Sequence, residues 1–356
     1  MLSRKALKAL LSVAAALSLL SQPSLADEGG VSFWIPGFFG SLAAAPMVPG
    51  FSLASMYYHP SVTSDSDVAR AKEITIGRIP ATIAGRVTAS LNADADIAIA
   101  IPQYTFATPV LGGQLTLGMI TSYGRNSASV DATLNAALLV GPFAFTRSRF
   151  DNIADSVTGL GDILPLASLR WNAGVHNFMI YGTGDVPVGA YQSTRLANIG
   201  IGHGAADGGL GYTYFDQKTG HEFSAVAGFT YNMLNTSTQY QNGVDFHLDW
   251  AASQFLTKQF QLGVVGYLYN QVTCDSGSGD HVGCFESRVA SVGAQLGYII
   301  PMGAVQGYVN VKAYREFESA HRPEGYNVWL TFVLSPAPPS GASPAMQTPT
   351  RPMYTK

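Results

Sequence analysis

Three ionisable residues that alternate along one short segment are the first candidates for chemistry. Asp245, His247 and Asp249 are each separated by a single residue. In a strand such alternate side chains point to the same side, about 7 Å apart. The trio could bind a cation or form a polar ladder. We expect the ladder, as part of the wall of an internal lumen, because buried polar groups need hydrogen-bond partners.

A second group of charges follows nearer the C-terminus. Arg288, Arg315, Glu316 and Glu318 carry opposite charges on two segments, which predicts an ion-pair network on the lumen wall. The sequence has neither a G-x-S-x-G nucleophile elbow nor an H-E-x-x-H zinc motif. The glycine-rich stretch 200–204 lacks the helical pattern that must follow a phosphate loop. We therefore predict no catalytic residue, no metal and no cofactor.

The two cysteines, Cys274 and Cys284, bracket a polar, glycine-rich stretch. An exported protein meets an oxidising compartment, so this pattern predicts a disulfide that closes a loop. Two free thiols, or a metal site that includes His281, are the alternatives. A structural zinc site usually has four protein ligands, and the sequence offers three here.

The first 26 residues have the features of a secretory signal peptide. Basic residues between positions 4 and 8 precede an apolar stretch, and the segment ends in a small-x-small cleavage site. We predict cleavage between Ala26 and Asp27; a retained anchor helix is the alternative. Loss of the three basic residues takes the net charge from −3 to −6. An acidic chain argues against nucleic acid as a partner.

Residues 27–50 form an apolar but irregular segment, rich in glycine, proline and aromatic residues. The prolines exclude a continuous helix or a central strand, and an exposed patch of this kind would be sticky. Two interpretations are open: a loop that caps one mouth of a barrel, or a plug inside the lumen that helps form a hydrophobic site. The candidate plug and ligand contacts are Phe33, Trp34, Phe38 and Phe39.

The rest of the chain has the composition of membrane-spanning strands. Only 12% of the residues are charged, about half the usual share. After the N-terminus no apolar run approaches the ~20 residues of a spanning helix. Apolar residues instead alternate with polar ones, as Phe246 and Leu248 do with His247 and Asp249. The alternating runs match the ~9–11 residues that a tilted transmembrane strand needs, whereas soluble strands average ~5–6.

The clearest alternations lie between residues 223 and 334. Further strands are expected near 51–59, 71–79, 83–91, 95–108, 113–123, 130–145, 163–172, 177–186 and 197–214. At about 22–26 residues per strand and connection, residues 51–334 hold roughly 12 strands, with about 10–14 possible. We predict an all-β, antiparallel, up-and-down transmembrane barrel, followed by a disordered proline-rich tail at 335–356. A soluble periplasmic β-protein is the alternative.

A series of short motifs resembles one known family. They run in order along the mature chain: Gly159-Leu-Gly-Asp-Ile-Leu-Pro165, Leu169-Arg-Trp171, Val186-Pro-Val-Gly-Ala-Tyr191, Asn198-Ile-Gly-Ile-Gly202, Glu222-Phe-Ser-Ala225, His247-Leu-Asp249, Tyr269-Asn-Gln271 and Arg315-Glu-Phe317. Together they resemble the family named for the meta-pathway of phenol degradation. The resemblance implies an outer-membrane barrel, often grouped with transporters of aromatic compounds, and supplies no catalytic motif.

The leading functional hypothesis is a passive, cofactor-free channel for small hydrophobic or aromatic solutes. It would sit in the outer membrane of a Gram-negative bacterium after export. The partners implied are outer-membrane lipid, the solute and the barrel assembly machinery. A general polar porin, a structural or adhesion barrel and a barrel enzyme are the alternatives.

Overall fold

The protein is described here by a computed structural model that covers residues 32–76, 79–140, 143–280, 284 and 286–338. The predicted signal peptide, the cleavage site between Ala26 and Asp27, and all but the first residues of the predicted tail lie outside the described residues. Two compact units are distinguished. One includes Asp65–Ala89 and Ala132–Phe150, which belong to the first four strands. The other, to which all that follows refers unless stated, includes the remaining described residues.

Antiparallel strands account for most of the described chain. They are β1 (Gly50–Ile76), β2 (Ile79–Thr105), β3 (Gln114–Val140), β4 (Phe143–Leu160), β5 (Leu164–Ala173), β6 (His176–Gly184), β7 (Ala205–Asp216), β8 (His221–Asn232), β9 (Asp245–Phe255), β10 (Phe260–Gln271), β11 (Arg288–Met302), β12 (Val305–Ala320) and β13 (Glu324–Pro336). No helix in this part of the chain is long and apolar enough to cross a membrane.

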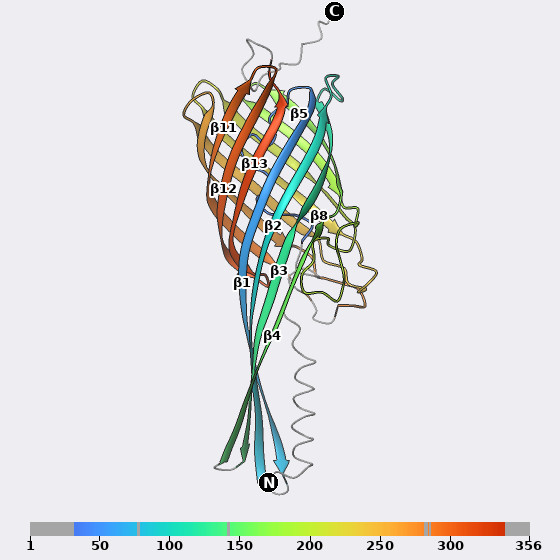
Figure 1. Ribbon diagram of the computed structural model, residues 1–356, viewed down its shortest axis with the longest axis vertical. Helices are drawn as coiled ribbons and strands as arrows, with labels where there is room; N and C mark the ends of the chain where they lie inside the picture. Colours follow the sequence, from blue (N-terminus) through green and yellow to red (C-terminus); the bar gives the residue numbers. More distant parts are fainter. Residues whose placement is uncertain (1–31, 77–78, 141–142, 281–283, 285, 339–356) are drawn as a thin grey trace, which may run out of the picture. The chain divides into compact units, whose positions relative to one another are not determined.

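The strands close into a single ring. Strands that are neighbours in sequence pair with each other, except β4 and β5, and β1 returns to β13 in a ladder that runs from Leu53↔Leu334 to Thr63↔Glu324. Figure 1 shows β11, β12, β13, β1 and β2 side by side. A closed ladder satisfies the backbone groups that an open sheet would leave unpaired in lipid.

Thirteen strands occupy twelve positions in the described barrel. Both β4 and β5 lie on the same side of β3, and β5 pairs only with its first residues, Gln114–Ile120. Between the two strands the Gly161 amide donates to the carbonyl of Ser122 at 2.8 Å. The pair therefore acts as one interrupted strand. The predicted all-β antiparallel barrel of about 12 strands is confirmed.

The barrel wall is apolar outside and polar inside. Along β8, Phe223, Phe229 and Tyr231 are exposed, whereas Glu222 and Ser224 are buried. This is the reverse of a soluble protein, in which buried side chains are mostly apolar. An outward band of large apolar side chains is the surface that a lipid bilayer requires.

The first strands are longer than the alternation predicts. Strands near 51–59 and 71–79 are one strand, β1, and those near 83–91 and 95–108 are one strand, β2; each has 27 residues. Pairing of β1 with β13 continues through Pro60 and Thr63. The segment 60–67 is polar and begins with a proline, which favoured a break. Ladder hydrogen bonds join backbone groups, so a strand can continue where side-chain alternation fades.

Two other predicted boundaries differ from the structure. β4 extends to Leu160, over a segment where apolar residues such as Phe150 and Ile153 fall on both faces and hide the alternation. The predicted strand at 197–214 is a loop up to Gly204, and β7 begins only at Ala205.

Four short turns lie at one end of the barrel, and the three longest connections lie at the other. The connections 174–175, 217–220, 256–259 and 303–304 join strands at the end where β1 begins and β13 finishes. The connections 185–204, 233–244 and 272–287 join strands at the opposite end. We call these the turn end and the loop end. In outer-membrane barrels the turns are periplasmic and the loops extracellular.

Candidate functional site

The irregular N-terminal segment lies inside the barrel. Phe33, close to the loop end, packs with Ile201 and Ala205. At the other extreme, the Met47 amide donates to Oε1 of Gln114 at 2.7 Å, and the Gln114 amide group donates back to the Met47 carbonyl at 2.6 Å. Gln114 is the first residue of β3, at the turn end. Residues 33–47 therefore run along the lumen; we call them the lumen segment.

Two opposite charges hold the middle of the lumen segment by its backbone. The carboxylate of Asp249, on β9, accepts from the amides of Gly37 at 2.8 Å and Phe39 at 3.1 Å. The Lys312 ammonium, on β12, donates to the carbonyls of Gly37, Phe38 and Phe39 at 2.5, 3.2 and 3.1 Å. We call this arrangement the clamp. Hydrogen bonds to charged groups are about twice as strong as neutral ones.

Gly37 is required by the clamp geometry. Its φ of +84° is left-handed, a conformation that costs other residues energy. A Cβ at this position would also lie 3.1 Å from the ring of Tyr314. The sequence Pro36-Gly37 thus makes a turn that presents the amides of Gly37 and Phe39 to Asp249.

A second anchor follows a few residues later. Glu222, on β8, accepts from the Ser41 hydroxyl at 2.7 Å and from the Leu42 amide at 3.0 Å. Leu42 also has a positive φ, of 62°. The amide of Ala44 donates to Thr213 at 3.0 Å. The lumen segment is therefore tied to β7, β8, β9 and β12, on several sides of the barrel.

Trp34 packs on the central member of the predicted polar trio. Its ring stacks on His247 with centroids 3.6 Å apart and an interplanar angle of 12°. His247 is buried, and its Nε2 lies 2.9 Å from Asp207 and 3.2 Å from the Tyr181 hydroxyl. The other two members have separate partners: Asp245 accepts from Asn232 at 2.8 Å, and Asp249 belongs to the clamp. The three side chains thus share a buried face but do not bond one another in a ladder.

The second predicted group of charges is divided between the two faces of the wall. Glu316 is buried and accepts from the Tyr267 hydroxyl at 2.6 Å and the Gly325 amide at 2.8 Å. Arg288, Arg315 and Glu318 are exposed. Arg315 alternates with the buried Tyr314 and Glu316, so the structure does not bring it to Glu316. The period of two along β12 already carried this signal in the sequence.

Two cavities lie beside the lumen segment. The smaller, which we call the aromatic cavity, has a volume of about 110 Å³ and is lined mostly by apolar side chains, among them Trp34, Ile97, Ile120, Leu164 and Ile201. The larger, which we call the vestibule, has a volume of about 780 Å³ and reaches turn-end residues such as Lys218 and Lys258.

The two cavities share three lining residues: Phe38, Phe39 and Leu166. The two phenylalanine rings lie 5.3 Å apart in a T-shaped pair. Phe39 also contacts Tyr181 at 5.4 Å, and Phe38 contacts Trp329 at 6.3 Å. We call Phe38, Phe39 and Leu166 the partition. Both phenylalanines are among the plug contacts predicted from the sequence. No feature of the sequence distinguishes Leu166 from the other apolar residues of the strands.

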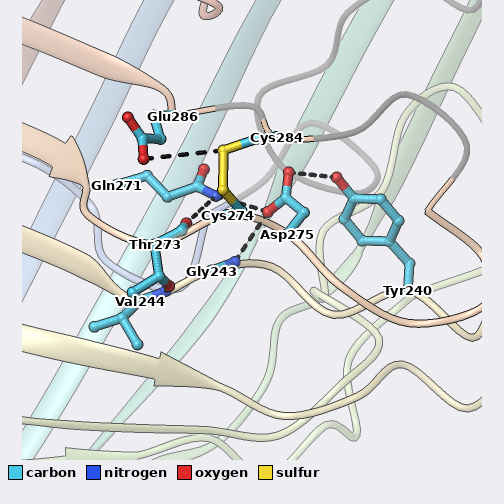
Figure 2. Close-up of a disulfide and its surroundings, with 9 residues drawn as sticks. All are labelled: Tyr240, Gly243, Val244, Gln271, Thr273, Cys274, Asp275, Cys284 and Glu286. Atoms are coloured by element: carbon cyan, nitrogen blue, oxygen red, sulfur yellow. Dashed lines mark hydrogen bonds between the residues drawn. A yellow bond between two sulfur atoms is a disulfide. The ribbon is translucent and has the colours of Figure 1, made fainter.

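The predicted disulfide is present at the loop end. Cys274 and Cys284 are bonded, with a Cα–Cα distance of 4.5 Å, as Figure 2 shows. Beside the bond, Asp275 accepts from the Tyr240 hydroxyl at 2.6 Å, the Gly243 amide at 2.9 Å and Gln271 at 2.7 Å. The disulfide closes loop 272–287, and Asp275 ties that loop to loop 233–244.

Fold and site together define a class of protein: a closed twelve-stranded barrel with an apolar outer face and its own N-terminal residues held inside. The chain belongs to the family described as "Putative MetA-pathway of phenol degradation", whose model matches residues 77–332. The resemblance predicted from the motifs is therefore confirmed.

One solved structure shares the fold at low sequence identity. An outer membrane channel from Pseudomonas putida F1 matches with a TM-score of 0.60 and 11% identity, over 84% of this chain and 98% of that one. A FadL homologue from Pseudomonas aeruginosa matches with a TM-score of 0.40 and 11% identity, over 85% and 94% of the two chains. No match is found among curated proteins.

Proposed function

We propose that this protein is a passive channel for small hydrophobic compounds, aromatic ones included, in the outer membrane of a Gram-negative bacterium. The observation that carries the proposal is the pair of cavities inside the barrel, which share the partition as a common wall. An apolar cavity toward the loop end can take a solute out of water or lipid by burying its apolar surface. The vestibule then offers a route to the turn end. No step needs a cofactor.

Several features support the membrane setting. The outward faces of the strands expose large apolar side chains, which match outer-membrane lipid. The predicted signal peptide would deliver the chain to the periplasm, where the barrel assembly machinery would insert it. The similar channel from Pseudomonas putida F1 is an outer membrane protein. We extend that location to this chain as part of the same proposal.

The lumen segment would act as the closure of the channel. Its backbone is held by Asp249, Lys312 and Glu222, while its aromatic side chains fill the space between the cavities. A segment held by a few strong polar contacts, with cavities on both sides, can shift without unfolding the barrel. Passage of a solute would require the partition to open, and the clamp would set how often it does.

An uptake assay tests the proposal. Cells that lack their own channels and express this protein should take up labelled p-xylene several times faster than cells with an empty vector, and sucrose at the same rate as those cells. A general porin would speed sucrose entry as well. Equal rates of p-xylene entry with and without the protein would contradict the proposal.

A further inference from the structure

The wall of the aromatic cavity has polar atoms that make no hydrogen bond to the described residues. Trp34 is only 5% exposed, and its indole Nε1 has no hydrogen-bond partner among the described residues. The same holds for the Thr183 hydroxyl and for both carboxyl oxygens of Asp185. All three residues line the cavity. Buried polar groups in folded proteins are normally paired, so three exceptions around one apolar cavity require an explanation.

The neighbouring carboxyl group, that of Asp162, has a structural role and serves as a comparison. Asp162 also lines the cavity, but its two oxygens accept from the amides of Gly189 at 2.7 Å and Ile201 at 2.8 Å. Asp162 therefore fixes the loop 185–204. The side chain of Asp185 does not fix the loop in this way. The backbone of Asp185 is itself fixed, because its amide donates to the carbonyl of Ala205 at 2.8 Å. Its two carboxyl oxygens have no hydrogen-bond partner in the part of the chain that the structure describes.

The donor and acceptor capacity of these atoms limits which ligands could hydrogen-bond to them. An indole N–H can only donate a hydrogen bond, so its partner must be an acceptor. Asp185 adds acceptor oxygens, and Thr183 can act either way. A hydrocarbon satisfies none of them. An ammonium group has no acceptor for Trp34, and a carboxylate would be repelled by the neighbouring carboxylate of Asp162. A neutral hydroxyl both donates and accepts.

Resting on the proposed function, we propose that the aromatic cavity recognises a small apolar molecule that carries one hydroxyl group. The hydroxyl would donate to Asp185 and accept from Trp34 or Thr183, while the apolar body lies against the isoleucine side chains. The cavity volume of about 110 Å³ is below the roughly 150 Å³ of a cavity that holds benzene, so it limits the ligand to a single small ring and excludes a long chain.

The electrostatics agree with a neutral ligand. Burial, and to a lesser extent the nearby Asp162 carboxylate, raise the pKa of Asp185 to about 8. At neutral pH this carboxyl therefore keeps its proton and offers no charge to attract a cation. It remains able to hydrogen-bond a hydroxyl as acceptor or as donor.

Binding of two isosteric rings tests the inference. p-Cresol and p-xylene differ by a hydroxyl in place of a methyl group. Calorimetric titration of the purified barrel in amphipol should give at least about tenfold tighter binding of p-cresol, the effect of one hydrogen bond to a buried carboxyl. The variant Asp185→Leu should lose this preference and bind p-xylene no more weakly. The isosteric Asp185→Asn, which keeps both donor and acceptor, should retain the preference.

Equal affinity of the wild type for both rings, or an unchanged preference in Asp185→Leu, would overturn the inference. Heat-modifiable migration on gels reports whether each variant has a folded barrel. The uptake assay separates the two proposals. If p-xylene uptake depends on the protein but p-cresol has no binding advantage, the channel stands and the hydroxyl site fails. If p-cresol binds as expected but neither ring enters faster, the channel fails.

Discussion

Removal of the clamp by Asp249→Ala together with Lys312→Ala should raise the open probability of the channel at least tenfold in planar-bilayer recordings. The two side chains make five charge-assisted hydrogen bonds to the backbone of Gly37, Phe38 and Phe39. Such bonds contribute about 1.5–3 kcal/mol each. Loss of even ~3 kcal/mol would shift the equilibrium of the lumen segment by more than 100-fold.

The double variant is preferable to either single one. Removal of one partner leaves the other charge buried and uncompensated, which destabilises the barrel for a different reason. A matched control is Asp155→Ala with Arg195→Ala, which removes an ion pair whose nitrogen and oxygen atoms are 2.7 Å apart. Neither residue lines the aromatic cavity or the vestibule. Open probability in the control should equal that of the wild type. If the clamp variant behaves like this control, Asp249 and Lys312 do not hold the closed state.

The second large effect is expected at the partition. Phe38→Ala with Phe39→Ala removes two rings that line both cavities and should join them into one passage. We expect p-xylene uptake to rise several-fold and naphthalene, a larger ring system, to rise more, because the constriction that discriminates by size is lost. Initial rates of uptake of the labelled compounds provide the measurement.

The vestibule offers a matched control for this substitution. Phe215 and Phe255 form another aromatic pair, with ring centroids 4.9 Å apart, and both line the vestibule but not the aromatic cavity. Phe215→Ala with Phe255→Ala removes the same side chains without opening the partition. Uptake rates that rise equally in both double variants would show that the partition is not the barrier.

The fold could be predicted because it depends on the alternation of apolar and polar residues within each strand, which is visible in short segments of the sequence. Phe223, Phe229 and Tyr231 alternate with polar residues because one face of the strand is on the outside of the barrel and the other faces the lumen. The same rule would have turned Arg315 outward, had it been applied to that residue. Long strands such as β1 were harder, because Pro60 and the polar residues after it interrupt the pattern while backbone pairing continues.

Several residues of the candidate site could be predicted from the sequence, but the contacts between them could not. Phe38, Phe39 and Asp249 were singled out from their types and positions. Their contacts depend on residues 210 or more positions apart in the chain, and Lys312 was not singled out. Sequence period tells which face a lumen residue lies on, not which backbone group it will meet. Asp185 was missed because a single carboxyl at the end of a strand has no pattern.

The proposed function requires that the lumen segment is the barrier inside the barrel. The decisive measurement is the single-channel conductance of a variant that lacks residues 29–49 and retains all of β1. We expect a conductance several times that of the wild type, with frequent long openings, in a barrel whose heat-modifiable migration is unchanged. A folded barrel with the wild-type conductance would contradict it.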